Sequence, residues 1–317
     1  MMNIQPENTM NKGVWPTMIT PFTDSNEVDY AALEQLVEWY IRQGVNGLFA
    51  VCQSSEMFFL TLEERRQIAR FVVEQAKGRV PVIASGHVSD SIVDQITELQ
   101  MMASTGVQAV VLVSNRLAAA EDSDDVWKAN AEKLLQEVPD IPFGLYECPY
   151  PYKRLLPPEL LGWCADTGRF QFLKDTCCDT EQIGRKLNAV RNRPLQLYNA
   201  NSATLLESLK LGVHGYSGIM ANFHPDLYVR LLEIHDRLPE EAERLQAFLG
   251  LASVIENQLY PVNAKYYLQL EGLPVGLHTR TKNKALLTYS NCREVEQLYA
   301  LTQQYREQYE HLKKGSV

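Results

Sequence analysis

Short apolar runs recur along the chain from residue 14 to residue 219, and an amphipathic segment follows each of them. We interpret eight runs as strands, at 14–22, 47–51, 81–85, 109–113, 142–146, 170–174, 194–198 and 214–219. Most of these runs lack alternation of apolar and polar positions, which is typical of strands buried on both faces of a parallel sheet. The amphipathic segments between them predict the helices that cover such a sheet.

Capping signals mark the starts of several of these helices. Asp29 precedes a helical run that Gly44 ends. Thr61 and Glu64 form a capping box at the start of a second helix. A third helix is expected to open at Ser89 or Asp90 and to run to about residue 104. Further helices are expected after Ser123, at Pro157-Pro158, at 180–190 and at 202–211.

Eight β/α units over roughly 210 residues predict an α/β fold, a closed (β/α)8 TIM barrel. An open, doubly wound sheet is the alternative. Strands stop after residue 225, and helices are expected at 226–238, 240–260, 263–270 and 294–311. We therefore divide the chain into a polar N-terminal leader (1–12), a catalytic barrel (13–222) and a C-terminal helical extension (223–317).

Composition narrows the classes of partner and compartment. The 317 residues include 39 acidic and 30 basic side chains, a formal net charge of −9, which argues against a nucleic-acid or anionic-membrane partner. We find neither a secretory signal nor an apolar run long enough to span a bilayer. The six cysteines show no paired spacing, so we expect reduced thiols and a cytoplasmic protein. No GxGxxG or GxxxxGK[ST] motif follows a strand.

Reactive side chains stand at the ends of several predicted strands. In a barrel of this kind the carboxyl ends of the strands meet at one mouth. Lys174 ends the sixth strand, and burial there would lower the pKa of its amine, which makes it a nucleophile toward ketones. Tyr146 ends the fifth strand, where its phenol can serve as a general acid and base.

The order of several short segments resembles one enzyme family. TMITPF, CQSSEMFFLTLEER, PVIASG, LYECP, FLKD and GVHGYSGIMAN stand at successive strand ends. Their set is similar to that of the dihydrodipicolinate synthase/N-acetylneuraminate lyase family of class I, Schiff-base aldolases. The resemblance covers residues 14–222 and, loosely, the helices after them. It implies a barrel with a helical extension, no metal or organic cofactor, and a homo-oligomer, either a tetramer or a dimer within one.

The resemblance also implies roles for individual residues. Lys174 matches the lysine that condenses with pyruvate or a longer 2-oxo acid, and Tyr146 matches the tyrosine that shuttles protons above it. Gln53 and Ser54 match the paired threonines of the family's GTTGE motif, which hold the substrate carboxylate. Four further residues are expected to border the pocket: Ser55, Glu147, Ser217 and Gly218.

Three departures from the family pattern concern the second substrate. CQSSE stands in place of GTTGE, and the second tyrosine that many members carry after strand four is absent from residues 114–120. The arginine that binds the aldehyde partner's carboxylate in the synthases falls near Pro151. We therefore predict that Arg116 or Arg154 contacts the distal end of a different substrate, either anionic or polyhydroxy.

The predicted function is a lyase of the aldolase type, with a 2-oxo acid bound to Lys174. One alternative is a dehydratase of 2-keto-3-deoxy sugar acids that uses the same imine. Another is a 2-oxo-acid-binding protein without turnover. A metal-dependent barrel aldolase would need ligands at the strand ends, for which His87 and His214 are the only histidine candidates near the barrel strands.

Overall fold

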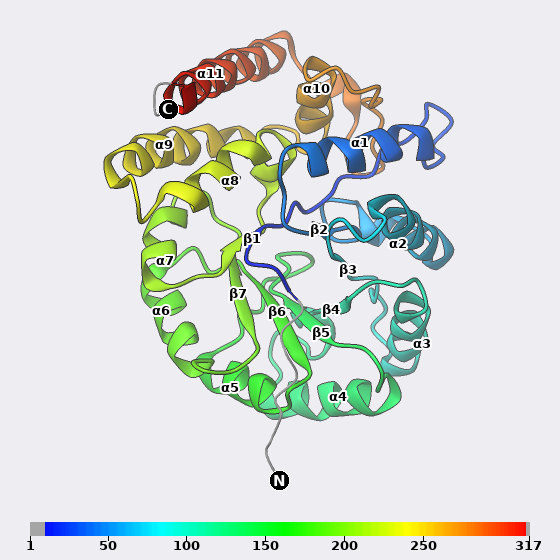
Figure 1. The fold of residues 1–317 in the computed structure, drawn as a ribbon. Helices are drawn as coiled ribbons and strands as arrows, with labels where there is room; N and C mark the ends of the chain where they lie inside the picture. The colour runs from blue at the N-terminus through cyan, green and yellow to red at the C-terminus, as the bar shows by residue number, and fades with distance from the viewer. Residues whose placement is uncertain (1–9, 315–317) are drawn as a thin grey trace.

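Eight parallel strands form one curled sheet inside a ring of helices (Figure 1). The computed structural model describes residues 10–314, and the side chains of 310–314 are not described. The first nine residues of the predicted leader lie outside this range. The strands are β1 (Gly13–Val14), β2 (Leu48–Phe49), β3 (Val82–Ala84), β4 (Ala109–Val113), β5 (Phe143–Tyr146), β6 (Phe170–Asp175), β7 (Gln196–Asn199) and β8 (Gly215–Tyr216).

The order of the strands confirms the predicted (β/α)8 barrel. It runs β1-β8-β7-β6-β5-β4-β3-β2, and the residues after β1 close the circle onto β2. There the Phe49 N–H donates to Pro16 O (3.0 Å), and the Met18 N–H donates to Phe49 O (3.0 Å).

The first strand is much shorter than the predicted run 14–22. Trp15 still bonds to β8, through its N–H to Tyr216 O (2.8 Å). Pro16 has no N–H to continue a ladder, and the chain turns from β8 toward β2 at this point. The apolar run therefore marks a buried segment of which only two residues form a regular strand.

Helices cover the outside of the sheet. They are α1 (Tyr30–Arg42), α2 (Leu62–Ala76), α3 (Ile92–Ala103), α4 (Asp124–Glu137), α5 (Pro158–Asp166), α6 (Thr180–Ala189), α7 (Leu205–Leu211), α8 (Pro225–Ile234), α9 (Pro239–Ala252), α10 (Val262–Leu270) and α11 (Tyr289–Lys314). Five 3-10 helices are η1 (Met57–Phe59), η2 (Ser114–Arg116), η3 (Ile219–Asn222), η4 (Ser253–Asn257) and η5 (Lys284–Leu286).

The capping signals mostly stand where the sequence places them. The Asp29 side chain accepts from Ala32 N, and Thr61 and Glu64 form the predicted capping box. The third helix differs, because its N-cap is Ser91 instead of Ser89 or Asp90. The Ser89 hydroxyl donates to the Glu98 carboxylate (3.0 Å), which leaves the cap to Ser91.

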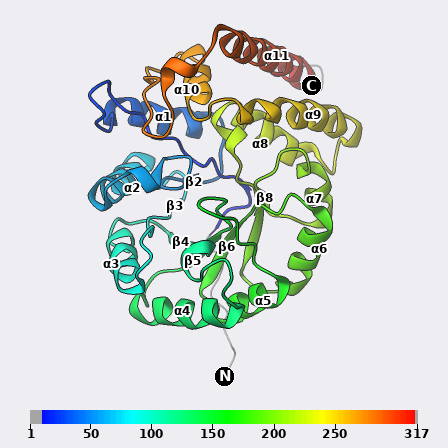
Figure 2. The ribbon, with the colours of Figure 1, turned by 180° about the vertical axis from the view of Figure 1, so that it is seen from behind.

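The C-terminal helices α9, α10 and α11 gather on one side of the ring, beside α8 and α1, in both views (Figures 1 and 2). α8 packs against β1 and completes the ring, so we propose that the boundary between barrel and extension lies after α8 instead of at residue 222. The helix predicted at 240–260 ends at Ala252, and η4 follows it. No helix among residues 10–314 is long and apolar enough to cross a membrane.

Aromatic side chains fill the barrel interior below the mouth. Phe172 stacks on Tyr198, with 4.5 Å between ring centroids, and its ring lies 5.5 Å from that of Trp15. The Phe49 ring lies 6.1 Å from Phe172 and 5.9 Å from Tyr146. All of these rings are buried, so they form a dry floor beneath the strand ends.

Candidate active site

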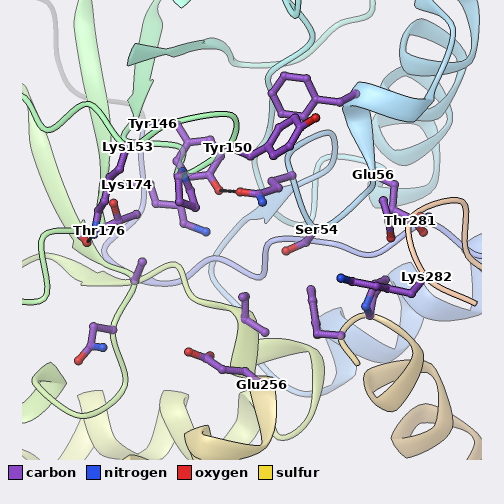
Figure 3. A pocket seen from close by; sticks show the side chains of 18 of the residues that line it. Ser54, Glu56, Tyr146, Tyr150, Lys153, Lys174, Thr176, Glu256, Thr281 and Lys282 are labelled. Atoms are coloured by element: carbon purple, nitrogen blue, oxygen red, sulfur yellow. Dashed lines mark hydrogen bonds between the residues drawn. The ribbon is translucent and has the colours of Figure 1, made fainter. Parts of the chain in front are cut away.

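Lys174 and Tyr146 lie side by side at the mouth of the barrel (Figure 3). They are partners in the parallel ladder between β5 and β6, so their side chains leave the sheet on the same face. The Lys174 Nζ atom lies 4.8 Å from the centroid of the Tyr146 ring. Each residue is only 4% exposed. The amine and the phenol therefore share one small, nearly dry space.

Burial shifts the pKa values of both groups. Desolvation lowers the pKa of Lys174 to about 8, against the weaker opposing attraction of Cys52, Cys148 and Glu256. About a tenth of an amine with this pKa is neutral at pH 7, compared with less than about a thousandth for a solvated lysine. Desolvation raises the pKa of Tyr146 well above its ordinary value, so the phenol keeps its proton. A neutral amine thus lies beside a proton donor.

The turn after β2 places Gln53 and Ser54 at the same mouth. The Tyr146 hydroxyl donates to Gln53 Oε1 (3.3 Å), the bond drawn as a dashed line in Figure 3. The Ser54 hydroxyl donates to Thr17 Oγ1 (3.3 Å). Both residues line the cavity that contains Lys174. Gln53 therefore fixes the position of the Tyr146 hydroxyl, and Ser54 adds a second hydroxyl to the cavity.

Ser55 and Ser217 do not line this cavity, although we expected them to border it. The Ser55 hydroxyl accepts from Cys52 N (2.7 Å) and donates to Cys52 O (2.7 Å), so it shapes the turn itself. The Ser217 hydroxyl donates to Trp15 O (2.9 Å), which joins β8 to the β1 segment. Both hydroxyls are fully buried and serve backbone geometry.

Gly218 lies at the edge of the mouth, and it is also absent from the cavity lining. A Cβ atom here would lie 2.2 Å from the hydroxyl oxygen of Tyr216, so only glycine fits. Its carbonyl accepts from Thr17 Oγ1 (3.4 Å), the hydroxyl that also accepts from Ser54. Gly218 therefore supports Ser54 from behind.

Glu147 lies on the opposite face of the sheet from Tyr146, contrary to its predicted place at the border of the pocket. Successive residues of a strand alternate in direction, so the residue after an inward Tyr146 points outward. Its carboxylate bonds to Lys186 Nζ (2.6 Å), which also bonds to Asp175 (2.5 Å). All three side chains are 2% exposed or less. Desolvation, with the charge of Asp175, raises the pKa of Glu147.

Arg116 and Arg154 do not line the cavity, contrary to the prediction that one of them contacts the substrate. Arg116 donates to Val88 O (3.1 Å) and pairs with Asp90 (2.8 Å). Arg154 donates to the carbonyl oxygens of Ala119 (2.8 Å) and Asp122 (3.1 Å), and it pairs with Asp124 (2.9 Å). Both guanidinium groups hold loops together beside the mouth.

Sequence reasoning missed several residues that do line the cavity, which has a volume of about 440 Å³. Lys153 comes from the loop after β5, where its amine donates to Thr176 O. Five others come from the C-terminal extension: Glu256, Tyr260, Pro261, Thr281 and Lys282. No strand-end pattern marks them. The only local signal is the four-residue spacing of Glu256 and Tyr260, which any amphipathic helix also produces.

Tyr260 supplies another phenol to the cavity. Its hydroxyl accepts from Asn222 Nδ2 (3.1 Å) and lies close to the Ser54 hydroxyl. Asn222 is fully buried and further donates to Thr17 O (2.9 Å). Desolvation raises the pKa of Tyr260 well above its ordinary value. The extension therefore adds a protonated phenol next to the Ser54 hydroxyl.

The segment that carries Thr281 and Lys282 is fixed by Arg280. This guanidinium pairs with Glu64 (2.6 Å) and donates to Phe59 O (2.8 Å). The backbone N–H groups of Arg280 and Thr281 donate to the buried Glu56 carboxylate at 2.7 Å each. The Arg280 segment, residues 278–282, is thus tied to the loop after β2.

The two histidines considered as metal ligands serve as acceptors for backbone N–H groups. His87 Nε2 accepts from Val113 N (2.6 Å), and His214 Nδ1 accepts from Leu197 N (3.2 Å). Among the side chains of residues 10–309 no group of three or more histidine, cysteine, aspartate or glutamate residues is arranged to hold a metal ion. The six cysteines are free.

A family model and the curated relatives of this chain all point to the same enzyme family. A model of the dihydrodipicolinate synthetase family matches residues 10–293. The 4-hydroxy-tetrahydrodipicolinate synthase of Maridesulfovibrio salexigens is 29% identical over 219 residues, 68% of this chain and 72% of that protein. The synthase of Thiobacillus denitrificans is 28% identical over 269 residues, 83% of this chain and 84% of that protein.

Solved structures have the same fold. YagE from E. coli K12, a prophage protein of the dihydrodipicolinic acid synthase family solved in complex with pyruvate, matches with a TM-score of 0.83 at 23% identity. The match covers 92% of this chain and 98% of YagE. The synthase from Acinetobacter baumannii, also complexed with pyruvate, matches with a TM-score of 0.82 at 21% identity over 93% of this chain and 99% of that one.

Proposed function

Because this chain belongs to the dihydrodipicolinate synthetase family, we propose that it is a lyase in which Lys174 forms a Schiff base with pyruvate or another 2-oxo acid. The observation that carries the proposal is the buried Lys174 amine, 4.8 Å from the Tyr146 ring in a cavity of about 440 Å³. Its lowered pKa supplies the neutral nucleophile that imine formation needs.

Each step assigns a task to a residue at the mouth. The neutral amine of Lys174 attacks the ketone carbon, and the ketone oxygen leaves as water after it takes up two protons, which gives the iminium. Tyr146, held by Gln53, is placed to deliver and recover these protons. The iminium then draws in the electron pair of a C–H bond on the neighbouring carbon, so that this carbon loses a proton and an enamine forms. Ser54 and the turn after β2 hold the substrate carboxylate.

Trapping of the imine tests this proposal directly. The protein is incubated with pyruvate, quenched into borohydride and digested, and the peptides are mapped by mass spectrometry. We expect one modified residue, Lys174, that gains the mass of pyruvate less one oxygen. A Lys174→Arg variant should remain unmodified. Modification of other lysines alone, or of none, would refute the Schiff base.

The second substrate separates the remaining possibilities. Wild-type protein is incubated with a panel of aldehydes plus pyruvate and, separately, with 2-keto-3-deoxy sugar acids. An aldolase joins or releases pyruvate, whereas a dehydratase expels water and releases none. Trapping at Lys174 without turnover of any compound would indicate a 2-oxo-acid-binding protein.

Assembly and location complete the proposal. From the family resemblance we expect a homo-oligomer, and from the thiol usage a cytoplasmic protein. The three tyrosines that line the cavity, Tyr146, Tyr150 and Tyr260, come from one chain. Sedimentation velocity at several concentrations, with activity measured in parallel, tests whether assembly is required for turnover.

A further inference from the structure

An unpartnered carboxylate faces the proposed nucleophile from the C-terminal extension. Glu256 lies on η4, and its side chain enters the cavity from the side opposite Tyr146 (Figure 3). The sequence resemblance assigns no role to this position, because the extension matches only loosely.

Glu256 differs from Glu56, the other carboxylate of the cavity. Glu56 accepts hydrogen bonds from two backbone N–H groups, and its second oxygen lies 3.9 Å from the Lys265 amine. No described residue donates a hydrogen bond to the side chain of Glu256 or forms an ion pair with it. Glu56 therefore holds a loop, whereas Glu256 is available to a bound molecule.

Burial and the neighbouring charges shift the pKa of the Glu256 carboxyl group. Burial raises the pKa of its carboxyl group, and the attraction of the Lys174 ammonium opposes that effect. The other titratable groups that feel its charge are the phenols Tyr216, Tyr228 and Tyr260, each with a raised pKa and so neutral near pH 7. A carboxyl group in these surroundings can hold a proton closer to neutral pH than a solvated one.

Several other polar groups at the mouth already make hydrogen bonds or ion pairs. Tyr146 is bound to Gln53 beside the Lys174 nitrogen, and the Lys153 amine is bound to Thr176 O. Arg116 and Arg154 bind loop carbonyls outside the cavity. Tyr146 is thus placed to serve the chemistry at the Lys174 nitrogen, and the unbonded Glu256 carboxyl group lies across the cavity from it.

We propose that Glu256 is a catalytic residue that exchanges a proton with the oxygen of the second substrate. This inference rests on the proposed Schiff base at Lys174. In the joining direction the enamine carbon bonds to the aldehyde carbon, the carbonyl electron pair moves to the aldehyde oxygen, and the Glu256 carboxyl proton passes to that oxygen. In the cleaving direction the Glu256 carboxylate takes the hydroxyl proton as the carbon–carbon bond breaks.

The test separates the two halves of the reaction. Glu256→Gln and Glu256→Asp are compared with wild type and with Glu240→Gln, a substitution at an exposed side chain of α9 in the same extension. The first half is followed by timed borohydride trapping with pyruvate and by exchange of the pyruvate methyl protons with deuterium in solvent. The second half is followed by turnover of the aldehyde and sugar-acid panel.

We expect Glu256→Gln to trap pyruvate and to exchange its protons within about threefold of wild type, while kcat for turnover falls by about 10²–10⁴-fold. Glu256→Asp should recover part of this loss, and Glu240→Gln should behave as wild type. The pH midpoint of trapping should move lower in Glu256→Gln, because the carboxylate that favours the Lys174 ammonium is gone.

The outcomes distinguish this inference from the function on which it rests. Wild type that fails to trap pyruvate refutes the Schiff base itself. Wild type that traps and turns over a substrate, with Glu256→Gln equally fast, overturns the role of Glu256 and leaves the Schiff base standing. Trapping without any turnover in wild type overturns it as well, since no second substrate then exists for Glu256 to serve.

Discussion

Lys186 holds together the strand ends that carry Lys174 and Tyr146. It bonds to Glu147, which follows Tyr146, and to Asp175, which follows Lys174. Lys186→Met keeps most of the side-chain volume and removes the charge. Two carboxylates that are no more than 1% exposed would then lack their cation.

The expected loss of stability is large. Removing one partner of a buried ionic group costs about 3–5 kcal/mol, against a total free energy of unfolding of about 5–15 kcal/mol for a typical domain. Without the ammonium, burial raises the folded-state pKa of Glu147 further above its unfolded value. Protonation below about pH 4 therefore removes most of the penalty, and the penalty grows as the pH rises through that folded-state pKa.

Urea unfolding of wild type and Lys186→Met at pH 5 and at pH 8 measures this effect. The difference in unfolding free energy should be larger at pH 8. A triple variant, Lys186→Met with Glu147→Gln and Asp175→Asn, removes every charge of the group and should recover more than half of the loss at pH 8. A Lys186→Met variant within 1 kcal/mol of wild type at both pH values, or one with a loss independent of pH, would refute the reasoning.

Three further predictions concern the mouth of the barrel. Timed borohydride quench at subsaturating pyruvate measures the rate of imine formation. This rate should rise about tenfold per pH unit up to about pH 8 and then level off, because Lys174 has a pKa of about 8. A rate that stays flat from pH 6 to pH 9 would contradict this prediction. Tyr260→Phe removes the hydroxyl that lies beside Ser54 and accepts from Asn222. It should raise the KM for pyruvate about fivefold, the equivalent of ~1 kcal/mol; an unchanged KM in steady-state assays would show that Ser54 needs no such support. Arg116→Ala should leave the KM of the second substrate unchanged. It should lower the free energy of unfolding in urea by about 1–3 kcal/mol, since the Arg116 guanidinium binds Val88 O and Asp90 in the wild type. A tenfold higher KM would show that Arg116 contacts the substrate after all.

The sequence was sufficient to predict the barrel and the positions of Lys174 and Tyr146 at its mouth. Buried parallel strands produce continuous apolar runs, and the point where a run ends on a polar residue marks the mouth, which is how Lys174 and Tyr146 stand out. The same rule of alternation, applied one residue further, sends Glu147 to the outer face of the sheet. That misplacement could therefore have been avoided from the sequence alone.

The remaining errors have causes that sequence patterns do not contain. Arg116 and Arg154 donate to backbone carbonyl groups. Every residue has such a group, so the sequence does not reveal which carbonyls accept these bonds. The residues of the extension that face the mouth lie after Ala252, where a run that reads as one helix gives way to η4. The break turns Glu256 and Tyr260 toward the cavity, and only the packing of the extension on the barrel decides this.

The Arg280 segment has a practical consequence for engineering. The loop after β2 anchors residues 278–282, and together with η4 they form the wall of the cavity away from Lys174. Directed evolution confined to positions 253–255, 257–259 and 281–282 would therefore change the shape and charge of one wall and leave Glu256, Tyr260 and the barrel strands untouched. Libraries of this kind offer a route to new aldehyde scope on an unchanged nucleophile.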